Sequence, residues 1–153
     1  LPGGFSPASQ RTLLNLPSGT GLYPLICYEI IFPDEVEIPE GKAGAIVNLT
    51  NDAWFGATPG PYQHFLQARI RAVEAGLTLI RGANNGICAV VDPRGHIISG
   101  VALNAKGAED ATFSIVDVSN WNNSDRKLNF WLVMLVVALT AVISRMGFIF
   151  REN

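Results

Sequence analysis

The sequence predicts a layered α/β or α+β domain followed by one membrane-spanning helix. Short apolar segments, separated by turns rich in Gly and Pro, surround one amphipathic helical segment, a pattern typical of a sheet with helices on one face. The chain then ends in an apolar segment, residues 128–150, in which Arg145 is the only charge. With 153 residues and 48% hydrophobic content, the chain is long enough for one such domain.

The elements of the domain can be predicted in chain order. Residues 1–20 are rich in Gly, Pro, Ser and Thr and should be mostly loop. A helix is predicted over residues 61–76, opened by Pro61 and closed by Gly76. Its predicted buried face carries Tyr62, Phe65, Leu66, Ile70 and Val73. Strands are predicted at residues 22–26, 43–49, 77–83, 87–92, 96–103 and 111–118.

The C-terminal segment has the length of a membrane span, which needs about 20 mostly apolar residues. We predict a domain over residues 1–120, a linker at 121–127, a transmembrane helix at 128–150 and a tail at 151–153. Arg145 is close enough to the end of the span to reach the interface. The alternative is a buried core helix. Basic residues flank the segment equally on both sides, so the sequence gives no orientation.

Charge and cysteine content exclude several classes of protein. Eleven basic and thirteen acidic residues give a net charge of −2, and no basic run is longer than Arg126 and Lys127, which argues against nucleic-acid binding. The two cysteines and two histidines lack the spacing of a zinc site or of a disulfide scaffold. We therefore expect no metal and no cofactor.

Cys27 is the candidate nucleophile. It ends an apolar strand and is followed by Tyr28 and Glu29, while Pro33 limits the next segment to about one turn. If the backbone turns helical after Cys27, the thiol lies at a sharp elbow beside free N–H groups that can bind an oxyanion. If the strand continues, Cys27 and Glu29 share one face of the sheet. The alternative to both is a buried core thiol.

Three motifs resemble one enzyme family. They read "GLYPLICYEIIFP", "VNLTNDAWFG" and "GPYQHFLQARIRAVEAGLTLIRGANNGICAVVDPRG", and a terminal apolar span follows them. Over about residues 4–151 the chain is similar to the apolipoprotein N-acyltransferases, a membrane-bound family of the nitrilase (carbon–nitrogen hydrolase) superfamily. The resemblance implies an α-β-β-α sandwich, of which this chain would form the C-terminal half.

The resemblance also implies an activity. Enzymes of this family move a fatty acyl chain from a phospholipid to the N-terminal amino group of a diacylglyceryl-cysteine lipoprotein. Cys27 would carry the acyl chain as a thioester. The implied partners are a phospholipid donor, the diacylglyceryl-modified apolipoprotein acceptor and the bilayer. The implied location is the periplasmic side of a bacterial inner membrane.

Matched positions give further candidate site residues. Glu29 would orient the site, and Tyr28 would contribute its backbone N–H to the oxyanion hole. Trp54 and Phe55 would grip the acyl chain or gate its entry, with Asn51 beside them as a substrate-binding residue. The alternatives are a solvated carboxylate for Glu29, core packing for the two aromatic residues and an Asx turn for Asn51.

The other polar residues of the motifs are interpreted as structural. Asp52 is read as a turn former, and His64 and Cys88 as structural or core residues. Arg81, near the end of the predicted strand 77–83, would border the pocket or, as the favoured alternative, belong to a turn. On the predicted helix, a surface ion pair is expected from residues spaced i,i+3. The residues of that surface are Arg69, Arg71 and Glu74.

One departure from the family pattern limits these expectations. The family triad is Glu-Lys-Cys with the first two residues upstream, whereas Arg11 is the only charged residue before Cys27. The sequence therefore predicts a C-terminal part of a longer protein that is inactive alone. Two alternatives remain: an amidase or nitrilase acting on soluble amides, and a non-catalytic membrane-anchored remnant.

Overall fold

The computed structural model describes residues 4, 10–36, 38, 43–115 and 123–149. The chain divides into two compact units, Leu1–Ser119 and Asn120–Asn153, and each is described here by itself.

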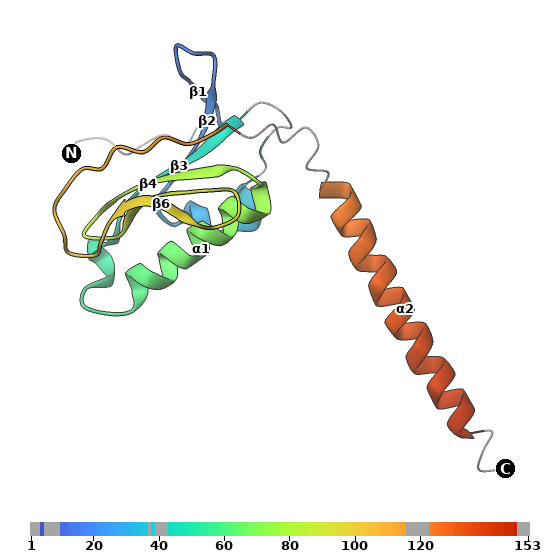
Figure 1. Cartoon of the computed structure of the whole chain (residues 1–153). Helices are drawn as coiled ribbons and strands as arrows, with labels where there is room; N and C mark the ends of the chain where they lie inside the picture. The colour runs from blue at the N-terminus through green and yellow to red at the C-terminus, as the bar shows by residue number, and fades with distance from the viewer. Residues whose placement is uncertain (1–3, 5–9, 37, 39–42, 116–122, 150–153) are drawn as a thin grey trace. The chain divides into compact units, whose positions relative to one another are not determined.

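The first unit is built on a six-stranded mixed sheet whose strands follow one another in chain order (Figure 1). The three central strands, β2, β3 and β4, are parallel, while the two edges are antiparallel. The carboxyl ends of parallel strands lie at the same edge of a sheet. Cys27, directly after β2, lies at this edge. The strands are β1 (Leu14–Asn15), β2 (Gly21–Ile26), β3 (Ala43–Asn51), β4 (Thr78–Asn84), β5 (Cys88–Val91) and β6 (Ile97–Val101).

Short helices follow the parallel strands β2 and β3, and one long helix, α1 (Gly60–Ala75), lies between β3 and β4. Pro61 stands in its first turn, and Gly76 ends it in the left-handed conformation at φ 66°. The 3₁₀ helices are η1 (Cys27–Ile31), η2 (Pro33–Glu35) and η3 (Asp52–Phe55). The predicted layered α/β fold is confirmed, as are the predicted helix and the strands before and after it.

The core lies between α1 and the sheet. It contains Leu25, Ile30, Ile46, Phe65 and Leu79, among others. Polar side chains are buried as well, and four of the six are joined by contacts near the carboxyl ends of β3 and β4. The buried polar residues are Asn48, Asp52, His64, Arg71, Thr78 and Arg81.

The predicted buried face of α1 is partly wrong. Tyr62 and Leu66 are 58% and 51% exposed. The helix instead buries a neighbouring stripe that includes Ala68 and Ala72, whose small side chains allow close approach to the sheet. Arg71, expected on the surface, lies in this buried stripe, although its predicted pair with Glu74 is present at 2.6 Å.

The strand predicted at residues 111–118 is also wrong where the structure describes it. Residues 111–115 adopt no strand, and residues 116–118 lie outside the described part of the chain. A β-branched run predicts a strand only if a neighbouring edge is free to pair with it.

The second unit consists of α2 (Asn123–Ile149). Its segment Leu128–Arg145 is long and apolar enough to cross a membrane.

Candidate active site

Cys27 lies at a sharp elbow between β2 and η1. The strand ends at Ile26, and the 3₁₀ helix begins with Cys27 itself. Cys27 has a φ of 52°, the left-handed region that residues other than glycine seldom occupy. Such strain persists only where the surrounding structure holds it, and it clusters at functional sites. Of the two geometries open from the sequence, the chain adopts the elbow.

Glu29 holds the elbow from the side of η1. Its Oε2 accepts a hydrogen bond from the backbone N–H of Ile26 at 2.7 Å and one from Arg11 at 2.9 Å. The same Arg11 nitrogen donates to the carbonyl oxygen of Pro24 at 2.9 Å. Burial raises the pKa of Glu29, but the Arg11 and Ile26 hydrogen bonds outweigh it and leave that pKa below its ordinary value. Glu29 is therefore ionised, and its hydrogen bonds stabilise the turn at Cys27.

Asn48, on β3, hydrogen-bonds to the backbone of the elbow. Its register partner on β2 is Leu25, and its side-chain amide donates to the carbonyl oxygens of Leu25 at 3.1 Å and of Cys27 at 3.2 Å. Arg81, its register partner on β4, donates to the side-chain oxygen of Asn48, Oδ1. Three adjacent parallel strands thus contribute side chains and backbone to one hydrogen-bonded row.

A buried ionic cluster lies next to this row. Arg81 pairs with Asp52 Oδ2 at 2.9 Å, and His64 Nδ1 lies 2.9 Å from Asp52 Oδ1. Burial lowers the pKa of Arg81, while the Asp52 carboxylate opposes that effect. The Asp52 carboxylate thus has two buried partners, while Arg81 Nε and His64 Nε2 have no hydrogen-bond partner among the described residues. We define Asp52, His64 and Arg81 as the buried cluster.

Thr50 connects the buried cluster to the cysteine. Its Oγ1 lies 3.5 Å from Cys27 Sγ and 3.0 Å from Asp52 Oδ1. Cys27 is partly buried and free of any disulfide, as is Cys88. The thiol is therefore within hydrogen-bond contact of a hydroxyl that is itself held by a carboxylate.

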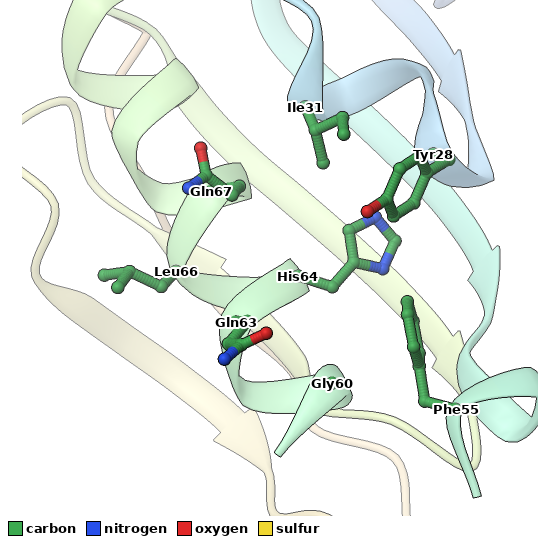
Figure 2. A pocket seen from close by; sticks show the side chains of 8 residues that line it. All are labelled: Tyr28, Ile31, Phe55, Gly60, Gln63, His64, Leu66 and Gln67. Atoms are coloured by element: carbon green, nitrogen blue, oxygen red, sulfur yellow. The ribbon is translucent and has the colours of Figure 1, made fainter. Parts of the chain in front are cut away.

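A cavity of about 550 Å³ lies between η1 and α1, near the elbow. Figure 2 shows His64 reaching from α1 toward Tyr28, with Phe55 on the other side. The His64 ring is 5.3 Å from the Tyr28 ring and 5.6 Å from the Phe55 ring. Both an apolar wall and polar groups are present. The lining residues are Tyr28, Ile31, Phe55, Gly60, Gln63, His64, Leu66 and Gln67.

Residues 10–123 match the model of the carbon–nitrogen hydrolase family. The chain belongs to this family. The elbow at Cys27, directly after the parallel strand β2, therefore lies within a carbon–nitrogen hydrolase domain.

The whole chain also aligns with longer relatives named apolipoprotein N-acyltransferase. It is 61% identical to that of Rhizobium rhizogenes, 57% to that of Allorhizobium ampelinum and 54% to that of Agrobacterium fabrum. Each alignment covers 100% of this chain and 29% of the relative. The chain thus spans less than a third of the length of these curated relatives.

Solved structures share the fold of the carbon–nitrogen hydrolase domain. A variant amidase of the nitrilase superfamily from Nesterenkonia AN1 has a TM-score of 0.55 at 23% identity, over 82% of this chain and 50% of the amidase. Another variant of the amidase from Nesterenkonia sp. AN1 has a TM-score of 0.50 at 26% identity, over 65% and 40%. That second structure shows covalent addition of the acetamide moiety of fluoroacetamide at the active-site cysteine of the amidase. The predicted nitrilase-like fold is confirmed.

The other predicted site residues of this carbon–nitrogen hydrolase domain lie around the elbow in different ways. Tyr28 and Phe55 line the cavity, whereas Trp54 is 85% exposed on η3. Asn51 caps η3 by accepting from the Ala53 N–H at 3.2 Å. It also accepts from the Asn84 side chain at 3.0 Å. The Asx-turn interpretation of Asn51 therefore describes its contacts, and any contact with a substrate remains a prediction.

Sequence reasoning missed the role of three residues in this domain. The sequence indicates a turn for Asp52 and for Arg81 and a structural role for His64, and the structure joins the three in the buried cluster. Arg81 lies within β4 and is 2% exposed. The signal that points to such a cluster is a polar residue at an inward position of a buried strand, as at Asn48 and Arg81.

The described residues contain no group of three or more His, Cys, Asp or Glu side chains that could hold a metal ion. At the elbow, Asn48 hydrogen-bonds to the backbone and Thr50 to Asp52. The arrangement is suited to holding a thiol in place beside hydrogen-bond donors.

Proposed function

We propose that this chain carries the nucleophile of an N-acyltransferase. The enzyme would transfer a fatty acyl chain from a phospholipid to the N-terminal amino group of a diacylglyceryl-cysteine lipoprotein, through a thioester on Cys27. The observation that carries the proposal is the left-handed elbow at Cys27, with its sulfur in contact with Thr50. The similarity to relatives named apolipoprotein N-acyltransferase supports the choice of substrates.

The reaction has two steps. First, the Cys27 thiol loses its proton and the thiolate attacks the ester carbonyl carbon of the phospholipid. The C–O bond breaks, and the lysophospholipid leaves as the alcohol after taking up one proton. Then the amino nitrogen of the lipoprotein attacks the thioester carbonyl, the C–S bond breaks, an amide forms, and the thiol is restored. A covalent intermediate divides one hard transfer into two easier ones.

The described residues supply three parts of this chemistry. The first N–H groups of a helix have no acceptor within the helix, so the Tyr28 N–H is available to the oxyanion. Glu29 positions the elbow, because its carboxylate binds the Ile26 N–H. Trp54 and Phe55, with Asn51 at the start of η3, would contact the acyl chain.

The glutamate and lysine that the family resemblance implies would come from the part of the relatives that this chain does not cover. Arg11, the only charged residue before Cys27, is engaged with Glu29 and Glu35. We therefore propose that activity requires the longer protein.

The test is intact-mass analysis of the full-length protein after incubation with phospholipid vesicles. We expect a fatty-acyl adduct on the wild type that hydroxylamine removes and that Cys27→Ala lacks. Cys88→Ala is the matched control and should keep the adduct. Cys88 is the first residue of β5, and its Sγ is hydrogen-bonded to the backbone N–H and carbonyl oxygen of Ala83. A folded wild-type protein without an adduct would overturn the proposal.

We further propose that residues 1–120 form the catalytic domain and that residues 128–150 span the membrane, with 121–127 as the linker and 151–153 as the tail. This arrangement would hold the elbow at the periplasmic surface of a bacterial inner membrane, where phospholipid is available. Support comes from the length and composition of α2. A cysteine introduced as Lys106→Cys should react with a membrane-impermeant maleimide from the periplasmic side, and protection there would contradict the orientation.

An amidase acting on small soluble amides is the second candidate. The similarity to the amidase with a modified active-site cysteine favours it. Release of ammonia from small amides by the full-length protein, in the absence of an acyl adduct, would select this alternative.

A further inference from the structure

We propose that Thr50 is a positioning residue whose hydroxyl donates a hydrogen bond to the Cys27 thiolate, and that the buried cluster holds the hydroxyl there. This inference rests on the proposed function of Cys27 as a nucleophile. Thr50 lies between the two partners, with its Oγ1 3.5 Å from Cys27 Sγ and 3.0 Å from Asp52 Oδ1.

The hydroxyl has one proton and two contacts. A threonine hydroxyl donates once and accepts through its lone pairs, so it can donate to only one of its two neighbours at a time. With a neutral thiol, Cys27 S–H donates to Thr50 Oγ1 and the Thr50 proton points to Asp52. Once the thiol has lost its proton, the Thr50 O–H turns to the sulfur, because a hydrogen bond to a charged acceptor is the stronger one.

Asp52 can release the hydroxyl at little cost because it keeps other partners. Its Oδ1 also lies 2.9 Å from His64 Nδ1, and its Oδ2 accepts from Arg81 at 2.9 Å. A buried carboxylate with only Thr50 as its partner would lose its stabilisation when the hydroxyl turned. The buried cluster therefore allows the rotation.

The charges around the thiol come from several elements. Asp52 alone would oppose a thiolate through like-charge repulsion, and the buried guanidinium of Arg81 offsets this carboxylate. Glu29 is paired with Arg11. Because each of these carboxylates is paired with an arginine, the direct hydrogen bond from Thr50 is the interaction that stabilises the Cys27 thiolate specifically. The groups that can carry charge around Cys27 are Tyr28 and Glu29 on η1, Asp52 on η3, His64 on α1, Arg81 on β4 and Cys88 on β5.

The backbone of Cys27 is held by the same set of residues. Asn48 donates to the Cys27 carbonyl oxygen at 3.2 Å and accepts from Arg81. Sulfur and carbonyl oxygen are thus both connected to the guanidinium of Arg81, one through Thr50 and Asp52 and the other through Asn48.

The test compares Thr50→Val, which keeps the shape and removes the hydroxyl, with Thr50→Ser, which keeps the hydroxyl. The rate of Cys27 alkylation by iodoacetamide is measured against pH in the full-length protein. Trypsin places Cys27 in the peptide of residues 12–42 and Cys88 in that of residues 82–94, so mass spectrometry reads the two thiols separately. The Cys88 peptide is the internal control.

We expect the midpoint for Cys27 to rise by about one pH unit in Thr50→Val, which is about tenfold less thiolate below the midpoint. Thr50→Ser should keep the wild-type midpoint, and the Cys88 profile should not move. An unchanged or lowered Cys27 midpoint in folded Thr50→Val would overturn the proposal, as would an equal rise in Thr50→Ser. If Thr50→Val does not fold, Thr50→Ala replaces it, since a smaller side chain cannot overpack the site.

The two proposals fail in different ways. Alkylation needs neither phospholipid nor lipoprotein, so a shifted midpoint without an acyl adduct would leave Thr50 as the thiolate partner and reject acyl transfer. An acyl adduct with an unshifted midpoint would support acyl transfer and reject Thr50 as the thiolate partner.

Discussion

Asp52 and Arg81 form an ion pair at 2.9 Å beneath the Cys27 elbow, and neither side chain has exposed surface. The pair joins the end of β3 to the middle of β4, because Asp52 begins η3 directly after β3 and Arg81 lies within β4. Charges so deeply buried are costly to desolvate, so their value lies in fixing geometry at the elbow and not in added stability.

Removing one partner of this pair should be strongly destabilising. We expect Asp52→Asn to lower the free energy of unfolding by about 3–5 kcal/mol, because it leaves the Arg81 guanidinium buried without a counter-charge. Urea unfolding of the full-length protein in detergent, followed by tryptophan fluorescence, measures the change. Arg94→Ala is the control, since Arg94 is exposed, and should change stability by less than about 0.5 kcal/mol. Equal effects of the two variants would contradict a structural role for the pair.

Glu29 should make stability depend on pH in the acid range. Its pKa in the folded chain lies below the ordinary value of 4.5, so it stabilises the fold above that pH and ceases to do so as pH falls through the folded pKa. We expect Glu29→Gln to lose about 0.5–1 kcal/mol near neutral pH, since the pair with Arg11 is partly exposed. The loss should shrink as pH falls below 4.5 and through the lowered folded pKa of Glu29.

Glu35→Gln provides the matched control for this measurement. Glu35 also binds Arg11, at 3.1 Å, but its carboxylate is more exposed than that of Glu29. Its replacement leaves the bond between Glu29 and the Ile26 N–H intact and should cost less. Unfolding curves at several pH values decide the matter, and a Glu29→Gln difference that stayed constant from neutral to acid pH would contradict the assignment.

The local parts of the fold were predictable from sequence. The apolar run before Cys27, the proline in the first turn of α1 and the glycine after it fixed a strand and a helix whose bounds the structure reproduces within one or two residues. The elbow was one of two open alternatives, because a strand and a turn after Cys27 satisfy the same residue pattern. Local preferences decide such elements, so they can be read without knowledge of the partners.

The buried cluster was not predictable in the same way. It depends on the register of β3 and β4, which brings Arg81 within reach of Asp52 at the end of β3, and on the position of His64 on α1. These residues are far apart in sequence, and no periodicity within one segment reports how strands align. Each polar residue taken alone has a commoner explanation as a turn or surface residue, and only the shared register makes them one site.

Gly86 should be sensitive to the addition of a single methyl group. A Cβ at this position would overlap Asp52 Oδ2 and lie 2.8 Å from the Cβ of Ala83. We expect Gly86→Ala to lower the free energy of unfolding by about 1–3 kcal/mol, because the carboxylate of Asp52 would have to move away from Arg81. Gly107→Ala is the control, since the nearest atom to a Cβ there is at 3.7 Å. A neutral Gly86→Ala would mean that the buried cluster tolerates displacement.

Trp54 and Phe55 should separate acyl-chain contact from structural support. Trp54 is 85% exposed, so Trp54→Ala should change the free energy of unfolding by less than about 0.5 kcal/mol. Under the proposed function it should nevertheless slow formation of the Cys27 adduct about 5- to 30-fold, the equivalent of about 1–2 kcal/mol of lost contact with the acyl chain. Phe55 contacts the rings of Tyr28 and His64, so Phe55→Ala should reduce both adduct formation and, by about 1–2 kcal/mol, stability.

Tyr62→Ala is the control for this pair of variants. Tyr62 is an exposed aromatic residue of α1 that does not line the cavity, so its removal should leave the rate of adduct formation unchanged. Intact-mass kinetics with phospholipid vesicles and urea unfolding are measured on the same preparations. If Trp54→Ala forms the adduct at the wild-type rate, the exposed indole does not contact the acyl chain, and the acyl-binding surface must then lie with Phe55 at the cavity between η1 and α1.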